Sequence, residues 1–375
     1  DLKTVLQPYH SMLKAENAGR RIDAYRSLLS FAVRLTREGK HEISAAVMSR
    51  VAPAIEGESD AKVIEQCLDG LTELYQVCST NGARGACESL IETVGRVLGR
   101  TELDPSLRRR MIEYLSSTGN PSALPILFSL LWESGLYPDV RAAIMSYRAL
   151  AVKEAVQLLR YAEEFALRMK LIDLLKNMGG DSIDALLENL GAREWFLRRN
   201  IVRIFGEIGD RSVSPRLESV LADEDHRVRL ELVRAFGKLN YKTGLLRSLD
   251  DKSLLVKSEA LRGLRNLIDT EEFIDLLDKL GASGDEVYVE LLKMIDEKRV
   301  LEAIHWISDM LRRLEWRTDG AANELRELAV ATLARLNSDE ARMILLDLRK
   351  SSDKALALLA ANAVKRFPDA RSNGS

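Results

Sequence analysis

Residues 194–238 read EWFLRRNIVRIFGEIGDRSVSPRLESVLADEDHRVRLELVRAFGK. An aliphatic residue followed by arginine occurs in it twice, first as Leu197-Arg198 and again as Val228-Arg229. Thirty-one residues separate the two arginines, and each arginine is followed by a phenylalanine seven positions later. A fixed period of this length predicts a stack of two-helix repeats in place of one compact core.

The same register extends in both directions along the chain. Steps between the second members of successive pairs are 33, 27, 30, 31, 28, 31, 38 and 31 residues, which indicates nine units over residues 104–367. The pairs are Leu107-Arg108, Val140-Arg141, Leu167-Arg168, Leu197-Arg198, Val228-Arg229, Val256-Lys257, Val287-Tyr288, Leu325-Arg326 and Leu356-Ala357.

Positions three and seven after each arginine are apolar in nearly every unit, and with the aliphatic residue before the arginine they form one stripe at helical spacing. An acidic residue stands four positions before the arginine in four units, where it can cap the helix and pair with the arginine one turn later. We therefore interpret the repeated arginine as structural and not as a ligand contact. The acidic residues are Asp104, Glu164, Glu194 and Asp225.

This pattern of an acidic residue, Val-Arg, an apolar helix and then Gly-Asp, as at Gly209-Asp210, resembles HEAT repeats. It is closest to the short variety of the bilin-lyase-like group. The resemblance covers roughly residues 104–367 and implies an all-α fold, a right-handed α–α superhelix. It also implies that the second helix of each family repeat lines the concave face.

Residues 1–103 are expected to be helical but out of register with the array. Five helices are predicted there, over 2–16, 20–38, 41–55, 61–79 and 83–98. They form either the irregular capping end of the array or a separate docking module. Residues 368–375 are small and polar, which predicts a disordered tail.

Composition favours a helical, cytoplasmic protein. The chain is 46% hydrophobic and 6% aromatic, and its net charge is −2, which argues against bulk attraction to nucleic acid or acidic membranes. Apolar runs are far shorter than the roughly 18 residues of a membrane span. The first residue is Asp1 and not Met, which indicates a trimmed or partial chain. Cys67, Cys78 and Cys87 lack the spacing of a zinc site, so free buried thiols are expected.

Signatures of catalysis are absent from the sequence. The four histidines, His10, His41, His226 and His305, form no i, i+4 pair, and no phosphate-binding loop, dinucleotide fingerprint or nucleophile elbow occurs. We therefore expect no enzymatic activity, no catalytic residue, no cofactor, no metal and no small-molecule substrate.

Charge is distributed unevenly along the array. Residues 193–265 hold 16 Lys and Arg against 11 Asp and Glu, whereas residues 271–375 hold 16 against 20. The fifth position after the repeat residue is basic in four consecutive units, which predicts a basic column on one wall. With neighbouring exposed basic residues, the candidate contacts for an acidic partner protein are Arg199, Arg203, Arg234, Lys238, Arg262 and Lys293.

A second interpretation of this column stays open. Glu231, Glu259 and Glu290 stand three residues before Arg234, Arg262 and Lys293, in the orientation that favours ion pairing within a helix. The column would then be a neutralised, solvated face.

The 38-residue step is the one irregular spacing. It predicts a helix over Arg299 to Arg317 with an apolar face, and it places Trp306 and Trp316 on opposite sides of that face. Insertions in solenoids often serve binding. These two residues either pack against a neighbouring repeat or present an exposed anchor for a partner.

Three functions are consistent with the sequence. The leading hypothesis is a non-enzymatic scaffold or adaptor that holds a partner protein along the concave face. The alternative is a nucleic-acid-binding protein of the kind found among HEAT-like DNA repair glycosylases, but no aromatic residues interleave with the basic column. A bilin-lyase-like enzyme follows from the resemblance alone, and it predicts affinity for a linear tetrapyrrole or phycobiliprotein subunits.

Overall fold

The computed structural model describes residues 2–280, 284–365 and 367, and all the regular structure in them is helical. The chain divides into two units, Asp1–Ala185 and Leu186–Ser375. The predicted all-α fold is confirmed. The predicted tail, residues 368–375, lies outside the described residues.

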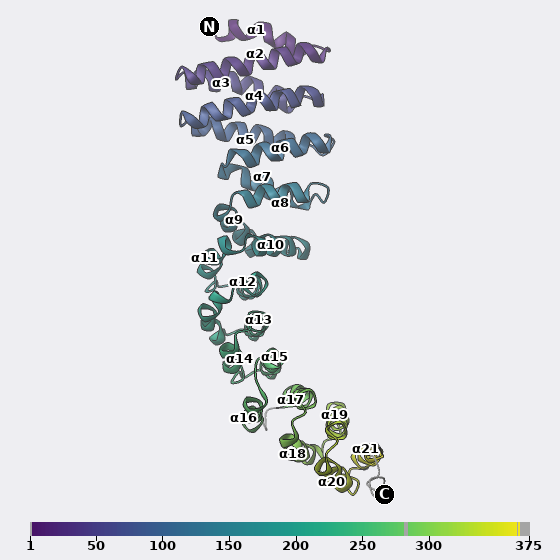
Figure 1. Cartoon of the computed structure of the whole chain (residues 1–375). Helices are drawn as coiled ribbons and strands as arrows, with labels where there is room; N and C mark the ends of the chain where they lie inside the picture. Colours follow the sequence, from purple (N-terminus) through teal and green to yellow (C-terminus); the bar gives the residue numbers. More distant parts are fainter. Residues whose placement is uncertain (1, 281–283, 366, 368–375) are drawn as a thin grey trace, which may run out of the picture. The chain divides into compact units, whose positions relative to one another are not determined.

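Unit 1 is a stack of helical hairpins (Figure 1). Helix α2 packs on α4, α3 packs on α5, and both α4 and α5 contact α6, so the expected boundary at residues 103 and 104 lies inside a continuous stack. Its elements are α1 (Leu2–Leu13), α2 (Ala18–Arg37), α3 (His41–Glu56), α4 (Ala61–Thr80), α5 (Arg84–Leu98), α6 (Pro105–Thr118), η1 (Pro121–Ala123), α7 (Leu124–Ser129), η2 (Leu130–Trp132), α8 (Tyr137–Ser146), α9 (Ala149–Tyr161) and α10 (Phe165–Met178), and α11 (Gly180–Glu188) runs across the division.

Unit 2 has two rows of helices (Figure 1). The helices that carry the repeat residue pack on one another in sequence order, and Figure 1 shows them on the inner side of the arc that unit 2 forms. This inner row is α12 (Trp195–Ile208), α13 (His226–Lys238), α15 (Leu254–Leu264), α17 (Asp285–Lys298), α19 (Gly320–Leu336) and α21 (Lys354–Val364). The outer row is η3 (Arg211–Ala222), α14 (Lys242–Ser248), α16 (Thr270–Leu280), η4 (Leu301–Ala303), α18 (Ile304–Leu314) and α20 (Asp339–Leu348).

The apolar stripe read from the sequence is the core of unit 2. On α12 the three stripe residues Leu197, Ile201 and Phe205 are fully buried, and Phe236 of α13 is fully buried at the equivalent position. Because one face of each inner helix is used for this core, the opposite face of the same helix is left for solvent.

Capping residues set the ends of these helices. Asp104 and Asp225 accept hydrogen bonds from the amides of Ser106 and Arg227, as expected, because an N-cap carboxylate satisfies amides that lack a helical partner. The expected caps Glu164 and Glu194 make no such bond.

A buried ion pair joins consecutive hairpins, and its partner differs from the one expected. Arg229 binds both carboxylate oxygens of Asp251, at 2.6 and 3.0 Å, and donates to the Asp223 carbonyl at 2.7 Å. Arg198 binds Asp223 in the same way, at 2.7 and 2.9 Å. The predicted ion pair between each arginine and the acidic residue four positions earlier was therefore wrong for Arg198 and Arg229. Each guanidinium instead bridges the loop before its own helix and an aspartate of the loop before the next inner helix.

The same arrangement, which we call the arginine clamp, occurs in unit 1. Arg21 of α2 binds Glu58 at 2.9 Å and donates to the carbonyls of Ala15 and Glu16. Arg108 of α6 binds Glu133. Helices α2 and α4 each have 20 residues, against 13 in α13. Longer hairpins explain why a search at a period near 31 residues does not reach helices α2 to α5.

The helix expected over Arg299 to Arg317 is shorter than predicted. Arg299 ends α17 in the left-handed conformation, with φ of 55°, and the regular helix α18 begins only at Ile304. Its predicted apolar residues are nevertheless buried: Val300, Ile304, Ile307, Leu311 and Leu314.

We expect Phe205→Ala to destabilise unit 2 by about 3–5 kcal/mol, because the change leaves a cavity in a core that only neighbouring hairpins fill. Hydrogen–deuterium exchange of peptides from α12 and α13 measures the loss. Phe165→Ala removes the same ring from a site where it is 70% exposed, and it should have little effect. Equal effects of the two changes would contradict the register.

We expect Arg229→Met to cost about 3 kcal/mol, because Arg229 and Asp251 are 4% and 7% exposed and the change leaves a buried carboxylate without its cation. Burial alone would raise the pKa of Asp251, but hydrogen bonds from Arg229 and the Ser253 amide outweigh it and hold that pKa below its ordinary value. The pair therefore stabilises the fold above about pH 4 and loses its contribution as the pH falls through the lowered pKa.

Urea denaturation at several pH values tests this assignment. The loss of stability of the original chain between about pH 4 and pH 2 should be smaller in Arg229→Met. The exposed pair of Lys279 and Asp250 gives the control, since Lys279→Met should cost less than about 1 kcal/mol. An unchanged acid dependence in Arg229→Met would refute the clamp.

Candidate functional site

The exposed side of the inner helices in unit 2 is the candidate site, and we call it the inner stripe. Positions one and five after the repeat residue lie opposite the buried positions three and seven, so they face away from the outer row (Figure 1). The position two before the repeat residue continues the same face. On α12 this face carries Phe196, Arg199 and Arg203.

The predicted basic column lies on the inner stripe and is largely ion-paired within the chain. Arg262 binds Glu259 at 2.8 Å and Glu290 at 3.1 Å, and Arg234 lies 3.6 Å from Glu231 and 3.8 Å from Glu259. The remaining pairs are Lys293 with Glu290, at 3.0 Å, and Lys238 with Glu207. The structure thus has the neutralised face that the sequence left open as the second interpretation.

Glu290 of α17 is the centre of this charge network. Its side chain is only 3% exposed, and it pairs with three cations, Arg262, Arg265 and Lys293. Burial alone would raise the pKa of Glu290, but the hydrogen bonds from Lys293 and Arg262 keep the pKa below its ordinary value. Glu290 therefore stays ionised and fixes the positions of the basic side chains around it.

The α12 end of the inner stripe is different, because its cations have no carboxylate partner. Neither Arg199 nor Arg203 forms an ion pair with any residue that the structure describes. The Arg199 guanidinium lies 5.9 Å from the centre of the Trp195 ring, and that of Arg227 lies 3.4 Å from it. Arg227 is neutralised by Asp225, whose pKa its hydrogen bond lowers to about 2.

The other helices bring further residues to the inner stripe that the sequence analysis missed. Leu255 of α15, two positions before the repeat residue, is 52% exposed, and Leu230 of α13 and Val289 of α17, one position after it, are half-buried. On α19 the positions two before and one after Arg326 are Glu324 and Glu327, which are exposed and form no ion pair with any described residue. Continuing the register past the basic column would have identified all five.

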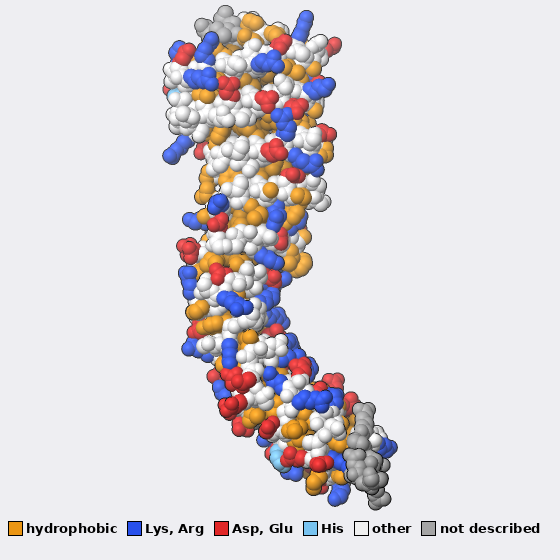
Figure 2. Space-filling view, in the orientation of Figure 1, with side chains coloured by type: hydrophobic (Ala, Val, Ile, Leu, Met, Phe, Trp, Pro, Cys, Tyr) orange, Lys and Arg blue, Asp and Glu red, His pale blue; other side chains and the backbone are white. Residues whose placement is uncertain are grey.

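Figure 2 shows the charged side chains of unit 2 on the molecular surface. Lys and Arg side chains gather beside α12 and α13 on the inner side of unit 2, and a group of Asp and Glu side chains lies beside α16 of the outer row. The side chains of both signs have hydrophobic groups between them.

The two tryptophans of the irregular step have different surroundings, and neither belongs to the basic column. Trp306 is half-buried and packs edge-on against Tyr288, with ring centres 5.7 Å apart. Trp316 follows α18 in a turn and is 83% exposed. Trp306 therefore packs against a neighbouring helix, and Trp316 has the exposure that an anchor for a partner requires.

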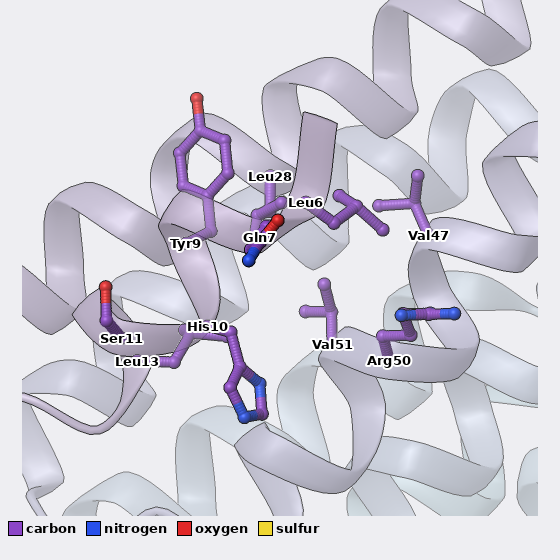
Figure 3. A pocket seen from close by; sticks show the side chains of 10 residues that line it. All are labelled: Leu6, Gln7, Tyr9, His10, Ser11, Leu13, Leu28, Val47, Arg50 and Val51. Carbon is purple, nitrogen blue, oxygen red and sulfur yellow. The ribbon is translucent and has the colours of Figure 1, made fainter. Parts of the chain in front are cut away.

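Unit 1 contains a separate hollow between α1, α2 and α3, with a volume of about 490 Å³. Leu6, Leu28 and Val47 line it, and Figure 3 shows the polar side chains of His10 and Arg50 beside it. No charged group in it is buried, since His10 and Arg50 are both exposed.

The cysteines lie in the core of unit 1. Cys67, Cys78 and Cys87 are free and buried, and burial raises the pKa of all three thiols. Over the described ranges no three His, Cys, Asp or Glu side chains come together as ligands for a metal ion. Nor does any helix in those ranges have the length and apolarity to cross a membrane.

Comparison with known families agrees with the packing of these hairpins. A sequence profile of HEAT repeats matches residues 152–237 and 183–265, which include the clamped hairpins of α12 and α13. The chain is a HEAT-repeat α-solenoid. No curated protein sequence matches the solenoid significantly.

Solved structures with a similar fold share little sequence with this solenoid. Kap95p, in a structure with RanGDP, is 14% identical over 96% of this chain and 52% of its own, with a TM-score of 0.43. YibA of Escherichia coli is 13% identical over 71% and 100%, with a TM-score of 0.39. Human deoxyhypusine hydroxylase is 15% identical over 76% and 98%, with a TM-score of 0.28. Likeness at these identities concerns the fold alone.

Proposed function

We propose that this solenoid is a non-enzymatic protein-binding scaffold that holds a partner protein on the inner stripe of unit 2. The observation that supports this most directly is the pairing of the basic column with Glu231, Glu259 and Glu290. Arginine is enriched in protein interfaces, where polar groups surround apolar ones, and the inner stripe combines arginines with partly exposed aliphatic side chains.

The same pairing disfavours a nucleic acid as the partner. A duplex or single strand gains affinity by releasing counterions from phosphates, which requires cations free to replace those counterions. Arg234, Arg262 and Lys293 already have carboxylate partners at 3.8 Å or less, and these carboxylates would repel a phosphate backbone.

The buried free thiols of unit 1 bear on the compartment in which the protein acts. Cys67, Cys78 and Cys87 are unpaired, and free cysteines are typical of a reducing compartment. We propose the cytoplasm as the place where the scaffold acts.

The test begins with capture of the partner from native lysate and measurement of its affinity. Reversing Arg203, Arg234 and Arg262 to Glu together should weaken binding of that partner at least tenfold, because the change removes an unpaired cation of α12 and the positive side of the ion pairs of α13 and α15. Calorimetry or surface plasmon resonance gives the affinity.

A matched control uses three exposed cations of the outer row. Lys242, Arg247 and Lys279 also pair with carboxylates, and their reversal should leave the affinity within about twofold of the original. Equal affinity of the inner variant and the original chain would exclude the inner stripe as the binding surface. Tight binding of oligonucleotides that falls steeply with salt would favour the nucleic-acid function instead.

A further inference from the structure

The free charges of the inner stripe have opposite sign on its first helix, α12, and on the later helices α17 and α19. Arg199 and Arg203 on α12 have no carboxylate partner, and Glu324 and Glu327 on α19 have no cationic partner, within the described part of the chain. Between them, on α13, α15 and α17, the basic column is paired with glutamates. Glu286 on α17, two positions before the repeat residue, is likewise exposed and has no cationic partner among the described residues. Uncompensated charge on the inner stripe is therefore basic on α12 and acidic on α17 and α19.

The middle of the inner stripe offers apolar surface. Leu255 is 52% exposed, and Leu230 and Val289 are half-buried beside the ion pairs. A single exposed leucine is ordinary on a protein surface. Three aliphatic side chains on three consecutive helices, flanked by ion-paired charges, form a strip that an apolar segment can cover.

The separation of the two ends sets the size of the ligand. Four helix-to-helix steps lead from α12 to α19 along the inner row, and packed helices are about 8–10 Å apart, which gives about 32–40 Å. An extended polypeptide rises about 3.3 Å per residue, so about ten to twelve residues span this distance.

We propose that the inner stripe binds an extended polypeptide segment of about ten to twelve residues with acidic residues at one end, apolar residues in the middle and basic residues at the other. The acidic end lies on α12, against Arg199 and Arg203, and the basic end lies on α19, against Glu324 and Glu327. This deepens the proposed function and rests on it. The segment is fixed in one direction by charge at its ends.

The uneven charge of the sequence supports the same polarity. Residues 193–265 carry five more basic than acidic residues, and residues 271–375 carry four more acidic than basic residues. Long-range attraction therefore orients a segment of this kind before the end contacts form. The stack of Arg199 and Arg227 on Trp195 orders the cationic end in advance of binding.

The probes for the test are three synthetic peptides of about twelve residues that share an apolar centre. One has acidic residues at one end and basic residues at the other, the second has acidic residues at both ends, and the third has basic residues at both ends. The first should bind the full chain at least tenfold more tightly than the other two, by fluorescence anisotropy. Equal affinities would overturn the proposed polarity.

Charge exchange on the protein gives the matched variants. Arg199→Glu with Arg203→Glu should transfer the preference to the peptide with two basic ends. Glu324→Lys with Glu327→Lys should transfer it to the peptide with two acidic ends. Glu324 and Glu327 are exposed and without ion pairs, so their double variant should keep the unfolding midpoint. Arg199→Glu also removes the contact with Trp195, so circular dichroism must show that this double variant is folded before its peptide preference is measured. If neither double variant changes the preferred peptide, the proposal is wrong.

A photoreactive group then reports the direction of the bound segment. Placed at the acidic end of the first peptide it should label α12 or α13, and placed at the basic end it should label α19. Labelling of the outer row, or of both ends without preference, would overturn the arrangement.

These results are separable from those of the proposed function. If the charge reversal of Arg203, Arg234 and Arg262 abolishes capture of the native partner but the peptides bind equally, the inner stripe is the binding surface and the proposed polarity is wrong. If that reversal leaves capture unchanged, the proposed function itself fails, whichever peptide binds.

Discussion

The structure of this solenoid depends on the contact between one hairpin and the next, because no hairpin buries its own apolar stripe completely. Two interactions make that contact. Fully buried side chains such as Phe205 and Phe236 exclude water from it, and the clamps of Arg198 and Arg229 tie each loop to the following one through two parallel hydrogen bonds. The apolar part supplies most of the free energy of stacking, and the bidentate pair fixes the relative position of neighbouring hairpins.

The candidate site is a consequence of that packing. A helix that buries positions three and seven after its repeat residue must expose positions one and five, and stacking then aligns these exposed positions over successive helices. The basic column arises in this way, and so do its partners, since Arg262 on α15 reaches Glu290 on the next inner helix, α17. The inner stripe is therefore as regular as the core, although its side chains differ from one helix to the next.

Periodicity in the sequence was sufficient to predict the all-α fold, the buried stripe and the basic column, because each depends on local helical spacing. It was also sufficient to predict the pairs of Arg234, Arg262 and Lys293 with glutamates three residues earlier. The partners of Arg198 and Arg229 could not be predicted in this way, because Asp223 and Asp251 come from neighbouring loops whose positions depend on stacking. The hairpins of α2 to α5 were not assigned to the array because their helices are longer and their clamp residue, Arg21, is not followed by another at the period of the array.

The shared carboxylates of the inner stripe have a consequence for how strongly it holds any ligand. Glu290 binds three cations at once. A ligand carboxylate that approaches Arg262 therefore competes with the Glu290 carboxylate, which the fold holds beside Arg262 at a high local concentration. Each contact made there replaces one of equal kind, and the net gain per exchange is small. A ligand bound over these ion pairs would therefore gain little per contact, and its dissociation would be fast.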